Sequence, residues 1–168
     1  VYSTTPIGTC EKIGPHIVHS PIEGKHPNLK ESVEIGARWV GCGDEKTLLK
    51  AVEFWAPFVK TVRTMPSASF TEFLKLRSTA KYGVNLVWTD YEKKVADSLD
   101  MDFQLVKDFD KDYNKLYQNM GIDWAQRYIL NPPNGVIGGH CVKPNAKLLN
   151  DQYPFEMLEL IFAMGDPE

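Results

Sequence analysis

The chain has 168 residues, enough for one domain or one and a half small ones. Hydrophobic residues make up 43 % and charged residues 24 %, close to average globular usage, which excludes disordered and fibrous classes. The net charge of −3 leaves no basic surplus to neutralise phosphates, so we expect no nucleic-acid partner. The sequence has no membrane-length apolar run, no signal-peptide pattern and only three scattered cysteines, which predicts a cytoplasmic protein with reduced thiols and no membrane contact.

The N-terminal part alternates short β-prone runs with turns and one helix. Strands are expected at residues 2–5, 16–19, 38–42 and 59–62. Residues 21–36, with several prolines and glycines, are expected to form a loop. Asp44 is the expected N-cap of a helix that ends at Pro57, because Thr47 and apolar residues at helical spacing follow it. A sheet of three or four short strands needs a larger partner or further strands.

The remaining sequence has a helical pattern. Apolar residues recur every three or four positions from Ser69 to about Leu99, which predicts an amphipathic helix of about 28 residues. Gly83 in its middle predicts close packing or a kink. A second stripe of side chains marks another face of this helix, so we expect a homodimer formed through it. Further helices are expected at about 102–119, from Pro144 and at 154–164, with a loop at 131–140. We therefore expect a mostly helical α+β chain.

Residues 130–145 read Leu-Asn-Pro-Pro-Asn-Gly-Val-Ile-Gly-Gly-His-Cys-Val-Lys-Pro-Asn and carry the most chemical content. Glycine and proline give an irregular backbone that can approach a ligand closely. The segment places Cys141 just before a helix with Pro144 in its first turn, where unpaired amides stabilise a thiolate. A nucleophilic cysteine and a buried structural cysteine are equally compatible with this pattern. A dyad of Cys141 with His140 is disfavoured, because adjacent residues rarely form that hydrogen bond and no orienting acid is evident.

Histidines near the N-terminus invite interpretation as a metal site. His16, His19, Glu23 and His26 lie close together in the sequence. On a strand, however, His16 and His19 point to opposite faces, because side chains alternate. We therefore expect no metal.

Five short motifs in order resemble the UDP-glucose/GDP-mannose dehydrogenase family of oxidoreductases. The Gly-Gly-His-Cys sequence at 138–141 is similar to the family's active-site loop. Residues 3–9, 19–24, 39–44 and 71–76 resemble the turn that ends its NAD-binding domain, its Ser-Pro-Glu segment, a glycine-rich strand and the Glu-x-x-Lys start of its central helix. The resemblance covers most of residues 1–150. It implies the C-terminal remnant of a Rossmann-like domain at 1–66 and a 6-phosphogluconate-dehydrogenase-like helical domain, which forms the family's dimer, at 67–168.

The resemblance also implies a reaction. Family members oxidise the C6 alcohol of a UDP- or GDP-sugar to the acid in two NAD-dependent steps, through a cysteine thiohemiacetal and a thioester. By resemblance Cys141 is the nucleophile, Lys75 stabilises the developing oxyanion, and Thr4 sits where the family orients the catalytic water. Without the resemblance, Lys75 is equally well a surface lysine with its ammonium in water. The implied substrate-binding positions are Glu23, Gly135, Gly138, Gly139 and His140.

Several positions depart from the family's pattern. Asn145 replaces the family's aspartate four residues after the cysteine, and an amide cannot act as a general base. Thr79 replaces its asparagine four residues after the lysine, and Ile22 its glutamate after Ser-Pro. The chain begins where the family's Rossmann domain ends, so we expect no NAD binding by this chain alone. A gene fragment, a split-gene product and a divergent domain remain open, as do two functions: part of a dehydrogenase, or a non-catalytic module that binds nucleotide sugars or dimerises.

Overall fold

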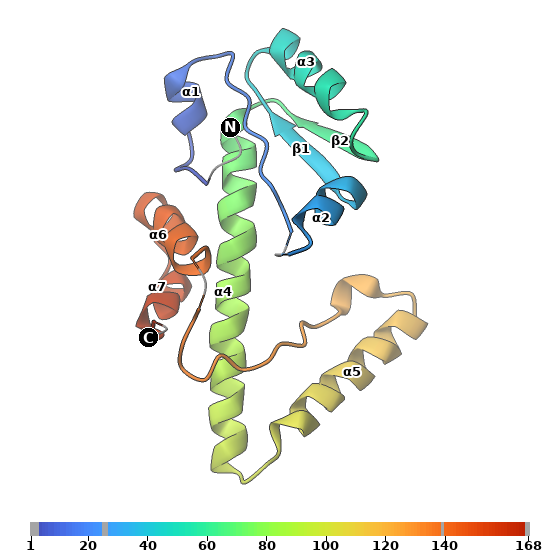
Figure 1. The fold of residues 1–168 in the computed structure, drawn as a ribbon. Helices are drawn as coiled ribbons and strands as arrows, with labels where there is room; N and C mark the ends of the chain where they lie inside the picture. Colours follow the sequence, from blue (N-terminus) through green and yellow to red (C-terminus); the bar gives the residue numbers. More distant parts are fainter. Residues whose placement is uncertain (1–3, 25–26, 139, 167–168) are drawn as a thin grey trace. The chain divides into compact units, whose positions relative to one another are not determined.

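The computed structural model describes residues 4–24, 27–138 and 140–166, and the chain is mostly helical with a two-stranded parallel sheet (Figure 1). It forms two compact units: Val1–Ala80 with Pro144–Pro154, and Lys81–Lys143 with Phe155–Glu168. None of the helices described is long and apolar enough to cross a membrane. The expected domains at 1–66 and 67–168 stay a prediction.

The first unit is built around a strand–helix–strand element. It contains α1 (Thr9–Ile13), α2 (Leu29–Ile35), β1 (Ala37–Gly41), α3 (Glu45–Trp55), β2 (Thr61–Met65), the start of α4 (Ala68–Ser98) and most of α6 (Val142–Gln152). The two strands are parallel, with Ala37 opposite Thr61 and Gly41 opposite Met65. The helix α3 connects them, as the crossover between parallel strands requires (Figure 1).

Local capping signals predict α3 correctly. The Asp44 carboxylate accepts a hydrogen bond from the Thr47 backbone N–H at 2.8 Å, which satisfies one of the unpaired amides of the first turn. The helix ends at Trp55, two residues before Pro57, because proline has no N–H to donate and cannot extend the helical hydrogen bonds. The prediction of a helix from Asp44 to Pro57 is therefore confirmed.

The strand predictions are only partly correct. The strand expected at 38–42 is β1, but the one expected at 59–62 begins later, as β2. The strand expected at 16–19 is wrong, because His19 alone pairs, in an antiparallel bridge with Gly41. Pro15 and Pro21 flank that run, and proline cannot donate to a ladder, which restricts the pairing. Of the strand expected at 2–5, residues 4 and 5 are not in a strand and the others lie outside the described residues.

The loop expected at 21–36 is wrong in its second half, which forms α2 (Leu29–Ile35). Proline and glycine lie on either side of this helix: Pro27 precedes it and Gly36 follows it. The eight residues between Pro27 and Gly36 contain no glycine or proline, so nothing interrupts a short helix.

The second unit contains the rest of α4, α5 (Phe103–Asn119), a 3₁₀ turn at Asp123–Ala125 and α7 (Glu156–Ala163). The helices expected at 69–99 and 102–119 are α4 and α5, and both predictions are confirmed. The helix expected from Pro144 begins at Val142, so proline occupies its third position rather than its first. The helix expected at 154–164 is α7, which begins two residues later.

The end of α4 has the hydrogen bonds of a Schellman motif. Asp100 takes the left-handed conformation at φ 53°, which Asp tolerates better than most residues. The Met101 N–H donates to the Ala96 carbonyl at 2.9 Å, and the Asp100 N–H donates to the Asp97 carbonyl at 3.1 Å. These bonds satisfy carbonyls that the last helical turn leaves unpaired and turn the chain toward α5.

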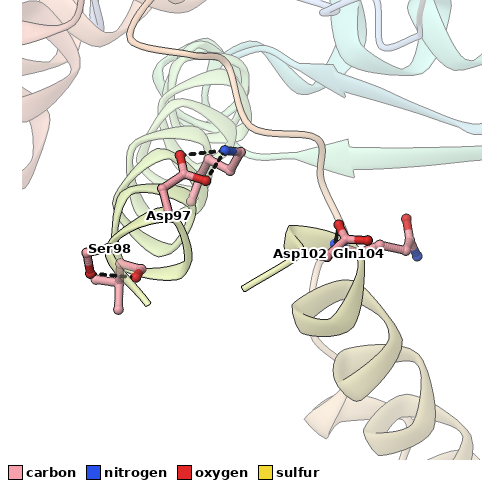
Figure 2. A network of polar contacts seen from close by, with 6 residues as sticks. Asp97, Ser98, Asp102 and Gln104 are labelled. Carbon is pink, nitrogen blue, oxygen red and sulfur yellow. Dashed lines mark hydrogen bonds and ion pairs between the residues drawn. The ribbon is translucent and has the colours of Figure 1, made fainter. Parts of the chain in front are cut away.

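Side chains support the same turn (Figure 2). Lys93 forms an ion pair with Asp97 one turn further along α4. The Ser98 hydroxyl donates to a backbone carbonyl three residues back at 2.7 Å. Asp102 caps α5 by accepting from the Gln104 N–H at 2.9 Å. The change of direction between the two helices is therefore specified by local residues.

Gly83 is a point of close packing, as the sequence predicts. A Cβ built there would lie 2.7 Å from Val142 Cγ1 and 2.8 Å from Ile161 Cδ1. In Gly83→Ala we expect a loss of about 1–3 kcal/mol in the free energy of unfolding, because Val142 is stiff at χ1 and the clash outweighs alanine's helix propensity. Urea denaturation measures the loss. The exposed Ser78→Ala on the same helix should show none, and an equally stable Gly83→Ala would contradict the packing argument.

Candidate functional site

The loop before Cys141 is anchored at residues 135–137. The Gly135 N–H donates to Asp90 Oδ1 at 2.6 Å, and the Gly135 carbonyl accepts from the Gly165 N–H at 2.7 Å. The Ile137 N–H donates to the Gly165 carbonyl at 3.1 Å, and the Ile137 side chain is buried. Gly135 has a φ of 82°, in the left-handed region that favours glycine. These contacts fix the backbone from which the Gly-Gly-His-Cys segment leads to α6.

Cys141 itself is exposed, as are Gly138 and His140. The interpretation of Cys141 as a buried structural cysteine is therefore wrong. Gly139 lies outside the described residues. The nucleophilic role of Cys141 and the substrate-binding roles of its neighbours stay predictions.

Lys143 lies two residues after Cys141 in the sequence, but its ammonium group contacts residues 164–166. Lys143 Nζ donates to the Met164 carbonyl at 2.5 Å, to the Gly165 carbonyl at 3.0 Å and to Asp166 Oδ1 at 2.7 Å. These groups follow the C-terminus of α7, where a cation is favourable. The Lys143 ammonium thus binds the segment that follows α7.

Asp90 is a structural carboxylate that is not among the predicted site residues. Its side chain is buried on α4, accepts from the Gly135 N–H and forms an ion pair with Lys94 at 2.8 Å. Burial opposes ionisation of Asp90, but the hydrogen bonds from Lys94 and Gly135 outweigh it and hold the pKa below its ordinary value. The four-residue spacing of Asp90 and Lys94 on a helix predicts their ion pair from the sequence. No local pattern predicts the hydrogen bond from Gly135, which is 45 residues away.

The anchoring of the loop should depend on Asp90 and on pH. We expect Asp90→Asn to lower the free energy of unfolding by about 1–3 kcal/mol at pH 7, because the buried charged acceptor is lost. Since the folded pKa is depressed, the wild-type advantage is fully present above the unfolded pKa of about 3.9 and disappears as pH falls through the folded value. Urea midpoints between pH 7 and pH 3 measure it. The exposed Asp97→Asn should cost less than about 0.5 kcal/mol, and a pH-independent difference would refute the assignment.

In the first unit, the structure brings three of the predicted site residues together. The Asn145 side chain is 3 % exposed, and its Nδ2 donates to Thr79 Oγ1 at 3.1 Å. The Thr79 hydroxyl lies 3.3 Å from the Lys75 backbone carbonyl, to which it donates. Asn145 and Thr79, two of the positions that depart from the pattern of the resemblance, are therefore direct partners in one partly buried polar contact.

Lys75 is half-buried, and its Nζ donates to the Ile22 carbonyl at 2.6 Å. The alternative of a surface lysine with its ammonium in water is therefore wrong, because the charge is held against the backbone of the 20–24 segment. Glu23 is exposed and Thr4 is half-buried. The oxyanion role of Lys75, the water-orienting role of Thr4 and the substrate contact of Glu23 stay predictions.

Glu72 holds the N-terminal turn of the first unit, a role that no local pattern in the sequence indicates. The residue is 1 % exposed, and its carboxylate accepts from the Gly8 N–H at 2.6 Å, the Cys10 N–H at 2.9 Å and the Thr5 hydroxyl at 3.2 Å. Burial, followed by the hydrogen bond and the charge of Glu72, raises the pKa of the Cys10 thiol to about 12. Glu72 thus holds the turn after Thr4 and keeps Cys10 protonated.

Two of the N-terminal histidines, His16 and His19, lie in different surroundings. His19 is buried, with Nδ1 2.9 Å from the Thr71 hydroxyl, while His16 lies 3.3 Å from Asp44 on the surface. His26 lies outside the described residues. Within the residues that are described, no group of three or more His, Cys, Asp or Glu side chains could hold a metal ion.

The strand–helix–strand element does not fit a dinucleotide. Gly41 at the end of β1 and Gly43 after it have the spacing of the dinucleotide-binding turn, but Lys46 stands where the third glycine is needed. The Asp44 carboxylate occupies the N-terminus of α3, and hydrogen bonds from Thr47 hold its pKa below the ordinary value. A negative charge at this helix end repels a pyrophosphate.

Comparisons with known proteins show the fold. No protein-family model and no curated protein sequence matches the chain. The UDP-D-ManNAc dehydrogenase of Pyrococcus horikoshii is similar with a TM-score of 0.69 at 19 % identity, over 96 % of this chain and 40 % of that one. The UDP-N-acetyl-mannosamine dehydrogenase of Staphylococcus aureus has a TM-score of 0.65 at 16 % identity, over 86 % and 31 %. The NDP-N-acetyl-D-galactosaminuronic acid dehydrogenase of Methanosarcina mazei has a TM-score of 0.64 at 19 % identity, over 89 % and 33 %. The chain thus spans less than half the length of these nucleotide-sugar dehydrogenases and shares the fold of that part of them.

Proposed function

We propose that the chain is the part of an NAD-dependent nucleotide-sugar 6-dehydrogenase that binds the UDP- or GDP-sugar and holds its C6 aldehyde on Cys141. The exposed thiol at the end of an anchored glycine loop carries the proposal. The fold shared with part of three nucleotide-sugar dehydrogenases supports it. So does the order of the motifs, from the N-terminal turn to the Gly-Gly-His-Cys segment.

The proposed chemistry is covalent capture. The Cys141 thiolate attacks the aldehyde carbon, a C–S bond forms, and the electron pair of the C=O bond moves to the oxygen, which takes up a proton to give a thiohemiacetal. We assign the stabilisation of that oxygen to the Lys75 ammonium. In the intact family enzyme NAD accepts the hydride, but since the described residues do not fit the dinucleotide, we assign no hydride step to them.

Binding is tested by calorimetric titration with UDP-glucose, UDP-N-acetylmannosamine and GDP-mannose. We expect saturable binding of one of the three, weakened about tenfold or more in Lys75→Ala, because charged hydrogen bonds are strong. The exposed Lys50→Ala should bind as the wild type does. Failure of all three nucleotide sugars to bind at millimolar concentration would overturn the proposal.

A specific observation favours a second function, a non-catalytic module that binds nucleotide sugars. The buried Asn145 amide bonded to Thr79 replaces the acid that the family uses as a base, so hydrolysis of a thioester loses its proton acceptor. A nucleotide-sugar aldehyde labelled with ¹³C at C6 separates the two functions. Capture moves the carbon signal from the aldehyde region to the thiohemiacetal region in the wild type but not in Cys141→Ser. Binding without that shift favours the non-catalytic module.

We also propose that the chain is a homodimer. In the second unit α4 exposes large apolar side chains, among them Tyr91 and Val95, which a partner copy would cover. Light scattering at micromolar concentration is expected to give twice the chain mass. A monomer at that concentration would contradict this expectation.

A further inference from the structure

The second unit contains a cavity of about 450 Å³ that none of the candidate catalytic residues lines. Asn85, Trp88 and Glu92 of α4 form one wall, because their spacing places them on one face of the helix. Asp110 of α5 and residues 127–128 complete the lining. The volume is within the roughly 300–1,000 Å³ of small-molecule sites.

Two aromatic rings at this cavity are exposed to solvent. Trp88 is 60 % exposed and Tyr128 is 59 % exposed, although large aromatic side chains are usually well buried. The Trp88 indole is held in place, since its Nε1–H donates to Glu92 Oε1 at 2.6 Å. An exposed ring that a hydrogen bond orients offers a flat apolar surface to a ligand.

The charges around the cavity balance. Asp110 forms an ion pair with Arg127 at 2.9 Å, and the Arg127 guanidinium also lies 3.6 Å from the centre of the Tyr113 ring. Glu92 adds a second carboxylate, and Lys81 adds a second cation, 5.6 Å from the centre of the Tyr128 ring. A phosphate or carboxylate ligand would face two carboxylates, and an ammonium ligand would face the cations. The balance therefore favours a neutral ligand.

We propose that this cavity binds a neutral saccharide. The apolar face of one pyranose ring stacks on Trp88, and its hydroxyls donate to Glu92 and Asp110 and accept from Arg127. Planar carboxylate, amide and guanidinium groups suit a sugar because each hydroxyl both donates and accepts a hydrogen bond. The inference does not rest on the proposed function, since neither Cys141 nor Lys75 takes part.

NMR of the indole N–H groups of the ¹⁵N-labelled full chain tests the site. The probes are methyl α-D-glucopyranoside, methyl α-D-mannopyranoside and N-acetylglucosamine, titrated into the tens of millimolar. We expect the Trp88 signal, assigned with Trp88→Phe, to shift saturably while the signals of Trp39, Trp55 and Trp124 stay in place. Glu92→Gln keeps the indole acceptor but removes its charge, which should weaken binding about fivefold. The exposed Glu53→Gln on α3 should bind as the wild type does.

Three outcomes would overturn the proposal. One is the absence of a Trp88 shift with all three sugars. Another is a larger shift with tetramethylammonium, which would make this an organic-cation site, or with uridine diphosphate, which would make it an anion site. The third is unchanged sugar affinity in Glu92→Gln together with unchanged affinity in Asp110→Asn. Failure of nucleotide-sugar binding or of aldehyde capture would leave these readouts unaffected.

Discussion

A limiting dose of iodoacetamide near pH 7 is expected to alkylate Cys141 first among the three cysteines. Cys10 is buried, and burial together with Glu72 raises the pKa of its thiol from 9.0 to about 12. Because the thiolate is the reacting form, this makes the reactive fraction of Cys10 about a thousandfold smaller at neutral pH. Cys42 is also buried, and its thiol donates to the Pro15 carbonyl at 3.4 Å. Cys141 alone of the three is exposed.

Peptide mapping by mass spectrometry measures the labelling of each cysteine. In urea the same dose should label all three at similar rates, which shows that the selectivity comes from the fold. Cys141→Ser should leave only slow labelling in the native protein. Equal native labelling of the three cysteines, or faster labelling of Cys10, would show that the Gly-Gly-His-Cys segment holds no preferred nucleophile.

The largest loss of stability is expected in Glu72→Ala. The substitution leaves the Gly8 and Cys10 N–H groups and the Thr5 hydroxyl without their buried acceptor, and it opens a cavity in the first unit. Each unsatisfied buried donor costs about 1–3 kcal/mol, so partial relaxation still leaves a loss of about 3–5 kcal/mol in the free energy of unfolding. Urea denaturation at pH 7 measures it.

Two further variants separate charge from packing at this position. Glu72→Gln preserves the side-chain volume but places an NH₂ group against the N–H donors of Gly8 and Cys10. We therefore expect a loss of about 2 kcal/mol in the free energy of unfolding, smaller than in Glu72→Ala. Glu72→Gln should also lower the pKa of Cys10, because the carboxylate is one of its causes, and so speed Cys10 alkylation. The exposed Glu53→Gln should change stability by less than about 0.5 kcal/mol. A Glu72→Ala protein as stable as wild type would refute the anchoring role.

The helices were predictable because their signals are local. Asp44 and Asp102 each precede an apolar periodic run, and both cap the helices that the sequence predicts. Strand pairing depends on residues far apart, so the β-prone run at 16–19 gave no hint that only His19 would find a partner. The α2 helix was missed because the prolines and glycines around it outweighed the short uninterrupted run between them.

The buried carboxylates of the candidate site were not predictable for a similar reason. Glu72 and Asp90 accept from backbone N–H groups, which every residue except proline carries and which leave no mark in a sequence. Their partners also lie far away, at Gly8 and Gly135. By contrast, the exposed Cys141 and the buried Asn145 stand in a glycine- and proline-rich motif, so the sequence identified these positions before the structure placed them.

The way in which the two units share the chain has a consequence for folding. Residues 144–154 belong to the first unit but follow almost all of the second, and Ile7 exchanges two hydrogen bonds with the side chain of Gln152. A ribosome must therefore synthesise residue 154 before the first unit can complete its core, which includes Ala146. Contacts this distant in sequence slow folding, because a long loop must close before they form. During synthesis the apolar surface of the N-terminal half stays exposed until residue 154 has been made. We therefore expect this chain to depend on chaperones more than a helical protein of the same size whose contacts are local in sequence.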